Sequence, residues 1–150
     1  MTSILVDADA CPVKEEIYRV ALRHGVAVFL VANQRLRIPN HPSIKFFLVD
    51  DGFDAADDAI AEVSNAQSIV ITSDILLAER VLNKGAICLG PTGKEFTEAD
   101  IGNAVATRAI MADLRAGGEQ IGGPKPFSSK DRSSFLQALD RSIVKLSRSK

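Results

Sequence analysis

A group of aspartates lies where expected strands end or expected helices begin, and its members are Asp7, Asp9, Asp54, Asp57, Asp58 and Asp74. In a parallel sheet the carboxyl ends of the strands meet at one edge, and ligands bind beyond that edge. Converging carboxylates repel one another unless they share protons or hard cations, and oxygen ligands suit Mg²⁺ or Mn²⁺. Such a metal polarises a phosphoryl oxygen and activates water, so the pattern indicates phosphodiester hydrolysis.

A simpler explanation of these residues is helix capping, because aspartate accepts hydrogen bonds from the free amides at a helix start. For Asp54 or Asp74 taken alone, capping is the better explanation. Several aspartates at matching strand ends favour the metal site. On a helix, Asp57 and Asp58 lie three and four residues after Asp54 and share its face.

Strands and helices alternate along the sequence, which predicts a single α/β domain over residues 1–150 with a parallel sheet of four to five strands and helices on both faces. The expected strands cover residues 3–6, 26–31, 44–49, 68–72 and 86–89. The expected helices cover residues 12–24, 54–64, 74–84, 97–116 and 128–148. Residues 32–43 are expected to form a loop that exposes Arg35 and Arg37.

Buried helix faces follow from apolar residues at helical spacing. For the helix after Asp54 we expect Ala56, Ile60 and Val63 on that face. For the last helix we expect Phe135, Leu139, Ile143 and Leu146.

Composition narrows the function classes. At 150 residues and a formal net charge of −1, the chain has no overall attraction for a phosphate backbone, so nucleic-acid binding needs a local basic patch. No apolar run approaches the roughly 20 residues that span a bilayer, and the N-terminus begins with a strand instead of a signal peptide. We expect a cytoplasmic protein that does not bind membranes. Cys11 and Cys88 are expected to be buried and to have no redox or metal role.

Four motifs, in order along the chain, resemble the bacterial YaiI/YqxD family. They are VDADACP at residues 6–12, GFDAADD at residues 52–58, ITSD at residues 71–74, and GGPKPFS at residues 122–128 followed by Asp131-Arg132. Four motifs in one order make the resemblance specific. It implies a PIN-like fold, within a nuclease superfamily that includes NYN-type ribonucleases, and RNA as the nucleic acid acted upon.

Carried over by motif, the resemblance implicates Asp7, Asp54, Asp57 or Asp58, and Asp74. We expect Asp7, Asp54, Asp58 and Asp74 to be the catalytic ligands of Mg²⁺ or Mn²⁺, with Asp9 and Asp57 as outer or alternate ligands. The choice between Asp57 and Asp58 depends on helix phase.

Two positions depart from the pattern of NYN-type enzymes. Leu76 stands where many of them have a second aspartate, which weakens the expected metal site or reduces it to one ion. The turn usually written Asn-Pro-Arg-Gly is Gly90-Pro91-Thr92-Gly93 here, so a phosphate-binding arginine is missing and Lys94 is its candidate substitute.

The candidate phosphate-binding residues are Thr72, Ser73, Lys94, Lys125 and Arg132. A hydroxyl at a strand end either binds phosphate or orients Asp74, and local capping explains it equally well. With Lys130, the cations Lys125 and Arg132 would form a basic lip for a nucleic-acid backbone, although charges on a terminal helix more commonly face solvent.

Two other functions fit parts of the pattern. A non-catalytic RNA-binding module would keep the fold with a degenerate carboxylate site, as Leu76 suggests. A haloacid-dehalogenase-like phosphatase would use Asp7 as a nucleophile, but the chain lacks the acidic pair that such enzymes carry after a later strand. A Rossmann dinucleotide site lacks its glycine fingerprint here.

Overall fold

The computed structural model describes residues 2–9, 11–49, 55–102 and 127–148. Its strands are β1 (Ser3–Asp7), β2 (Ala27–Ala32), β3 (Ile44–Leu48), β4 (Ser68–Ile71) and β5 (Ile87–Leu89). They form one five-stranded sheet in the order β3-β2-β1-β4-β5, and all four pairings are parallel. The predicted α/β fold is therefore confirmed, with β1 at the centre of the sheet.

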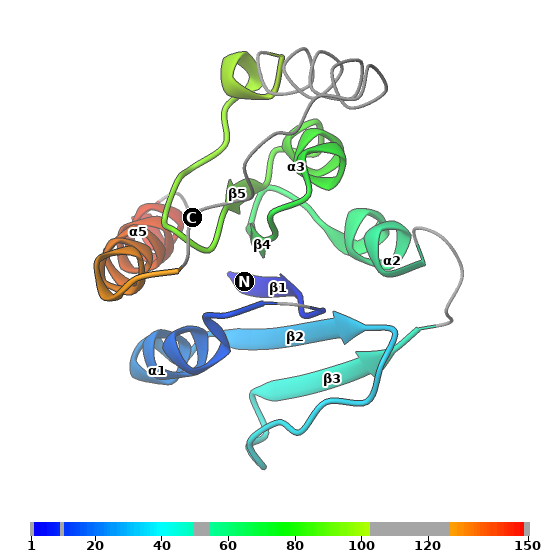
Figure 1. Cartoon of the computed structure of the whole chain (residues 1–150), viewed down its shortest axis with the longest axis vertical. Helices are drawn as coiled ribbons and strands as arrows, with labels where there is room; N and C mark the ends of the chain where they lie inside the picture. The colour runs from blue at the N-terminus through cyan, green and yellow to red at the C-terminus, as the bar shows by residue number, and fades with distance from the viewer. Residues whose placement is uncertain (1, 10, 50–54, 103–126, 149–150) are drawn as a thin grey trace, which may run out of the picture.

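Helices cover both faces of the sheet. They are α1 (Lys14–His24), α2 (Ala55–Val63), α3 (Ile75–Leu82) and α5 (Ser129–Arg148), and residues 98–102 are also helical. Figure 1 shows α1 and α5 on one side of the sheet and α2 and α3 on the other. Because each of these helices has one apolar face, the sheet is enclosed between two hydrophobic layers.

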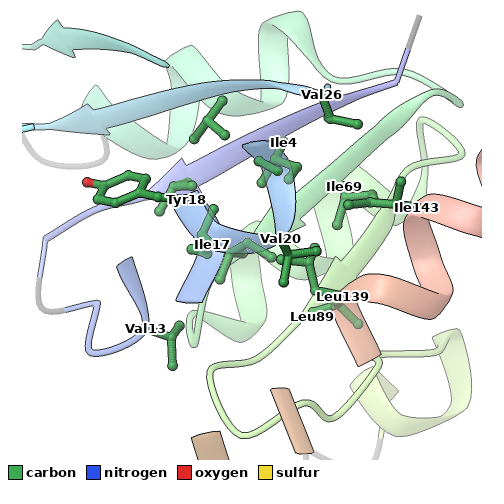
Figure 2. Close-up of a cluster of buried hydrophobic side chains, with 14 of the residues drawn as sticks. Ile4, Val13, Ile17, Tyr18, Val20, Val26, Ile69, Leu89, Leu139 and Ile143 are labelled. Carbon is green, nitrogen blue, oxygen red and sulfur yellow. The ribbon is translucent and has the colours of Figure 1, made fainter. Parts of the chain in front are cut away.

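The layer under α1 and α5 is the larger core (Figure 2). Strand residues Ile4 and Ile69 pack there against Ile17 of α1 and Leu139 of α5, and all four are fully buried. Each such side chain contributes roughly 1.5–3 kcal/mol when it leaves water. The predicted buried face of α5 is confirmed, since its members Phe135, Leu139, Ile143 and Leu146 are all buried.

The second layer joins the sheet to α2 and α3. Leu5 and Val70 contribute from the central strands, and Ile60, Leu77 and Val81 contribute from the helices. Strand residues therefore alternate between the two layers, with Ile4 in one and Leu5 in the other, as expected of strands buried on both faces.

Polar caps begin three of the helices, including the cap predicted at Asp74. The Asp74 carboxylate accepts from the Leu76 N–H at 2.9 Å and begins α3. The Thr97 hydroxyl accepts from the Asp100 N–H at 3.2 Å before residues 98–102. Before α5, the Asp131 N–H donates to the Ser128 hydroxyl at 3.2 Å. Asp54, the predicted cap of α2, lies outside the described residues, as does the end predicted for the helix over residues 97–116.

Two local predictions were wrong. Proline was expected to begin the first helix, but α1 begins at Lys14 because Pro12 and Val13 lie in a turn and the Ile17 N–H makes the first helical bond, to the Val13 carbonyl. Val63 was expected to be buried, but it is 60% exposed because it lines a groove between α2 and β3.

Within the described ranges, no helix has both the length and the apolar character required to cross a bilayer.

Two glycines with positive φ differ in the space around them. Gly25 (φ 69°) ends α1, and a Cβ there would meet nothing within 4 Å. At Gly93 (φ 90°) a Cβ would lie 2.6 Å from the Ser134 carbonyl oxygen of α5.

We expect Gly25→Ala to cost about 1–2 kcal/mol of stability from backbone strain alone. Gly93→Ala should cost about 1–3 kcal/mol more because the backbone of α5 must move. Urea unfolding of both variants checks this, and equal losses would contradict it.

Asp140 of α5 joins the C-terminal end of α1. Its Oδ1 lies 2.6 Å from His24 Nε2 and accepts from Arg23 Nη2 at 2.7 Å. The hydrogen bond with His24, assisted by Arg23, holds the pKa of Asp140 below its ordinary value of 3.8. A lowered pKa in the folded state stabilises the protein above that ordinary value, and the benefit disappears as the pH falls through the lowered pKa.

We therefore expect wild type to be more stable than Asp140→Asn at neutral pH and the difference to disappear in acid. Urea unfolding of both proteins over a pH series measures this. A stability difference that does not change with pH would contradict the electrostatic explanation.

Candidate functional site

Parallel pairing of β1 with β4 brings together the polar residues that end these strands. Val6 pairs with Ile71, and the next residues, Asp7 and Thr72, are joined by a side-chain hydrogen bond. The hydroxyl of Thr72 donates to Asp7 Oδ2 at 2.8 Å, and the Asp74 N–H donates to Thr72 Oγ1 at 3.0 Å. Thr72 is buried, so its hydroxyl links the Asp7 carboxylate rigidly to the start of α3.

Asp9 is held from the neighbouring strand. Its Oδ2 accepts from the Asn33 N–H at 3.0 Å, which connects the loop after β1 to the loop after β2. The Ala8 N–H donates to the Val31 carbonyl at 2.9 Å, so the backbone between Asp7 and Asp9 is also fixed. The two carboxylates therefore have defined positions at the carboxyl edge of the sheet.

A small hollow opens at this edge, with a volume of about 20 Å³. It is lined by Asp7, Asp9, Cys11, Pro12, Ile71, Thr72, Ser73 and Pro91. A volume of this size has room for a single occupant no larger than a water molecule or a metal ion. The lining residues include two carboxylic acids, Asp7 and Asp9, and two hydroxyl residues, Thr72 and Ser73.

The charge of Asp7 is disfavoured by its surroundings. Burial raises its pKa above 3.8, the hydrogen bond from Thr72 opposes the rise, and the negative charges of Asp9 and Asp74 add to it. The carboxylates of Asp9 and Asp74 are thus close enough to Asp7 to disfavour its negative charge. A bound cation would relieve both the repulsion and the cost of burial.

The donor chemistry fits a hard cation, although the described residues alone do not complete a ligand set. Carboxylate and hydroxyl oxygens suit Mg²⁺ or Mn²⁺. Within the part of the chain that the structure describes, no three acidic, histidine or cysteine side chains converge on a metal position. The predicted ligand Asp54 lies outside that part. Burial raises the pKa of the Cys11 thiol above 9.0, so Cys11 is a neutral wall of the hollow at pH 7.

The two remaining predicted ligands lie in the first turn of α2 and differ in surroundings. Asp58 is exposed, and its Oδ1 accepts from Arg80 Nη1 of α3 at 2.8 Å. Asp57 is half-buried. Neither residue lines the hollow around Asp7, so the structure does not bring them into that cluster.

The predicted phosphate-binding residues are not gathered in one place. Ser73 is exposed on the wall of the hollow, and Lys94 is exposed outside it. Lys125 lies outside the described residues. Arg132 makes contacts within the protein, and its role with phosphate, like those of the other residues, stays a prediction.

Arg132 joins α5 to the N-terminal turn of α1. Its Nη1 donates to Glu16 Oε1 at 2.7 Å and to the Pro12 carbonyl at 3.3 Å, and its guanidinium lies 4.8 Å from the centre of the Phe127 ring. Glu16 is buried, so this ion pair satisfies a carboxylate that would otherwise be costly. Because Pro12 lines the hollow, Arg132 also supports its wall.

Several residues of the site were not expected from the sequence. Cys11 and Pro91 line the hollow, and the Asn33 backbone holds Asp9. The signal for Pro91 was its place in the Gly90–Gly93 turn directly after β5. No sequence pattern indicates Asn33, because a backbone donor does not depend on residue type.

We expect Thr72→Val, which keeps the side-chain shape, to destabilise the protein by about 1–3 kcal/mol. Loss of the Thr72 hydroxyl removes a hydrogen-bond partner from both the half-buried Asp7 carboxylate and the Asp74 N–H. Thr72→Ser keeps the hydroxyl and serves as the control. Denaturant unfolding measures both variants, and a Thr72→Val variant as stable as Thr72→Ser would show that the link contributes nothing.

Comparison with known proteins gives matches over nearly the whole chain. A family model described as "Uncharacterized BCR, YaiI/YqxD family" matches residues 5–145. A UPF0178 protein of Sphingopyxis alaskensis is 68% identical over 146 residues, which cover 97% of this chain and 95% of the relative. A UPF0178 protein of Nitrobacter winogradskyi is 54% identical over 150 residues, which cover 99% and 96%. No solved structure matches.

Proposed function

Because the chain belongs to the YaiI/YqxD family and carries a linked carboxylate site, we propose that it is a Mg²⁺- or Mn²⁺-dependent PIN-like nuclease that hydrolyses phosphodiester bonds in RNA. The observation that carries the proposal is the Asp7–Thr72–Asp74 link. Through it the Asp7 carboxylate, which lines the ion-sized hollow together with Asp9, is tied to the backbone of Asp74 at the start of α3. Oxygen ligands suit Mg²⁺ or Mn²⁺, and such a metal can catalyse phosphodiester hydrolysis.

Asp7 and Asp74 would hold the metal, completed by Asp54 and by one acid of α2, with Asp9 as an outer ligand. When bound, the metal would lower the pKa of a coordinated water and polarise a phosphoryl oxygen. Between the two acids of α2, burial favours Asp57, because Asp57 is half-buried and Asp58 is exposed. This choice differs from the expectation of Asp58 that the sequence motif gives.

The protein's own residues would position the reacting groups. The Thr72 hydroxyl holds the Asp7 carboxylate in one orientation, so little reorganisation is needed when substrate arrives. The exposed Ser73 hydroxyl can donate to a phosphate oxygen above the hollow. The Gly90–Gly93 turn lacks a phosphate-binding arginine, and Lys94 and Lys125 would supply the positive charge in its place.

A second candidate function is a non-catalytic RNA-binding module. Leu76 is exposed in the first turn of α3, where NYN-type enzymes carry a further acid. A carboxylate cluster that lacks this acid would hold the metal more weakly, and the protein would then bind RNA without cleaving it. The two functions differ in whether bound Mn²⁺ leads to hydrolysis.

We expect wild type to bind Mn²⁺ in calorimetry, and Asp7→Asn and Asp74→Asn each to weaken binding at least tenfold, or roughly 1.4 kcal/mol. Asparagine preserves the shape of both residues and the cap at position 74 while removing the charge. Asp140→Asn, on the surface of α5, is the matched control and should bind normally. No binding by wild type, or unchanged binding by Asp7→Asn, would overturn the metal site.

Cleavage is tested separately, with single-stranded RNA and Mn²⁺. We expect hydrolysis by wild type and by Asp140→Asn, and a loss of at least 100-fold for Asp7→Asn, in the range found for removal of a key electrostatic group. If RNA and Mn²⁺ both bind and no product forms, the binding module is the correct function.

A further inference from the structure

An apolar groove lies on the sheet face between α2 and β3. The connection from β2 to β3 over residues 33–43 contains no helix, and α2 packs against β1 and β2. The groove has a volume of about 440 Å³, within the range of pockets that accept small organic groups. It is lined by Ser3, Leu5, Phe29, Val31, Phe47, Leu48, Val49, Ala59 and Val63.

Two aromatic rings form part of the groove. Phe47 of β3 is 48% exposed, an unusual state for a large apolar side chain in a sheet. Its ring centre lies 5.9 Å from that of Phe29, with the planes tilted by 35°. Phe29 therefore supports one side of Phe47, and the exposed part of Phe47 presents an aromatic surface to solvent. Nucleobases stack on such surfaces without regard to sequence.

Strand register connects this groove to the carboxylate site. Asp7 pairs with Val31, and Val31 pairs with Phe47, so the three residues form one row across β1, β2 and β3. Adjacent strands lie about 4.8 Å apart, which places the Cα atoms of Asp7 and Phe47 about 10 Å apart. A phosphate held beside Asp7 would therefore have a neighbouring base within reach of Phe47.

A positive charge lies in the next row. Lys45 pairs with Phe29 and is exposed. Since side chains alternate along a strand, Lys45 is on the same sheet face as Phe47. An ammonium group beside an aromatic surface suits a chain of alternating phosphates and bases better than it suits an apolar peptide.

We propose that the apolar groove between α2 and β3, which contains Phe29 and Phe47, is a base-binding subsite for single-stranded RNA. The RNA would run from the carboxylate site into this groove. This inference rests on the proposed function, because it uses a phosphate at Asp7 to set the position of the neighbouring nucleotide. The base stacks on Phe47, and Lys45 contacts the following phosphate. Recognition is by stacking and charge, so the subsite accepts any base.

The test measures binding of a fluorescent oligoadenylate with nuclease-resistant phosphorothioate linkages in the presence of Mn²⁺, so that a metal can hold a phosphate beside Asp7 while cleavage does not contribute. We expect Phe47→Leu to weaken binding roughly fivefold or more, and Phe47→Tyr to retain it, because only tyrosine keeps a ring to stack on. Lys45→Gln should weaken binding and reduce its salt dependence. Leu22→Ala removes an exposed apolar side chain of α1, on the opposite face, and is the control.

A second probe separates base from backbone. An abasic oligonucleotide of equal length should bind wild type and Phe47→Leu equally. Loss of oligoadenylate affinity in Phe47→Leu without rescue by Phe47→Tyr would overturn the stacking role. Wild type that binds no oligoadenylate would also overturn the inference, and if Asp7-dependent Mn²⁺ binding persisted, the metal site would stand alone.

Sedimentation of the same proteins addresses the competing occupant, a second copy of this chain. A wild-type dimer that Phe47→Leu dissociates, with unchanged affinity for oligoadenylate, would assign the groove to self-association and overturn the inference. A monomeric wild type together with the expected loss of affinity supports it.

Discussion

The Thr72 hydroxyl is the contact on which the arrangement of the site depends. It donates to the Asp7 carboxylate at the end of β1 and accepts from the Asp74 backbone N–H at the start of α3, so one buried group joins the end of β1 to the N-cap residue of α3. This is possible only because β1 and β4 are parallel neighbours whose last residues share one edge. Burial raises the pKa of Asp7, and the negative charges of Asp9 and Asp74 add to the rise, so a bound cation would stabilise the charged form of Asp7.

The local part of the fold could be predicted from the sequence because it depends on nearby residues. The apolar run that ends at Val6 is a central strand, Asp74 caps α3, and Gly25 ends α1 with a positive φ. Each of these features follows from a few neighbouring side chains and their backbone preferences. The motifs around Asp7 and Asp74 also indicate, from sequence alone, that the ends of β1 and β4 belong to one site.

Features that depend on the order of the strands could not be predicted. Periodicity assigned Val63 to the buried side of α2, but it does not show that this end of the helix lies over the open groove beside β3. The pairing of Glu16 with Arg132 joins residues that are far apart in the sequence. The row from Asp7 through Val31 to Phe47 likewise requires the register of three strands, which no local pattern contains.

The position of α5 affects the timing of folding during synthesis. All five strands are complete by Leu89, yet one face of their sheet waits for Phe135 and Leu139, in a helix of 20 residues near the C-terminus. The growing chain therefore exposes the part of that sheet face that α1 leaves uncovered until α5 has been made. At that stage Glu16 also lacks Arg132. A nascent chain of this fold is thus most in need of a chaperone after β5 has been made and before α5 has.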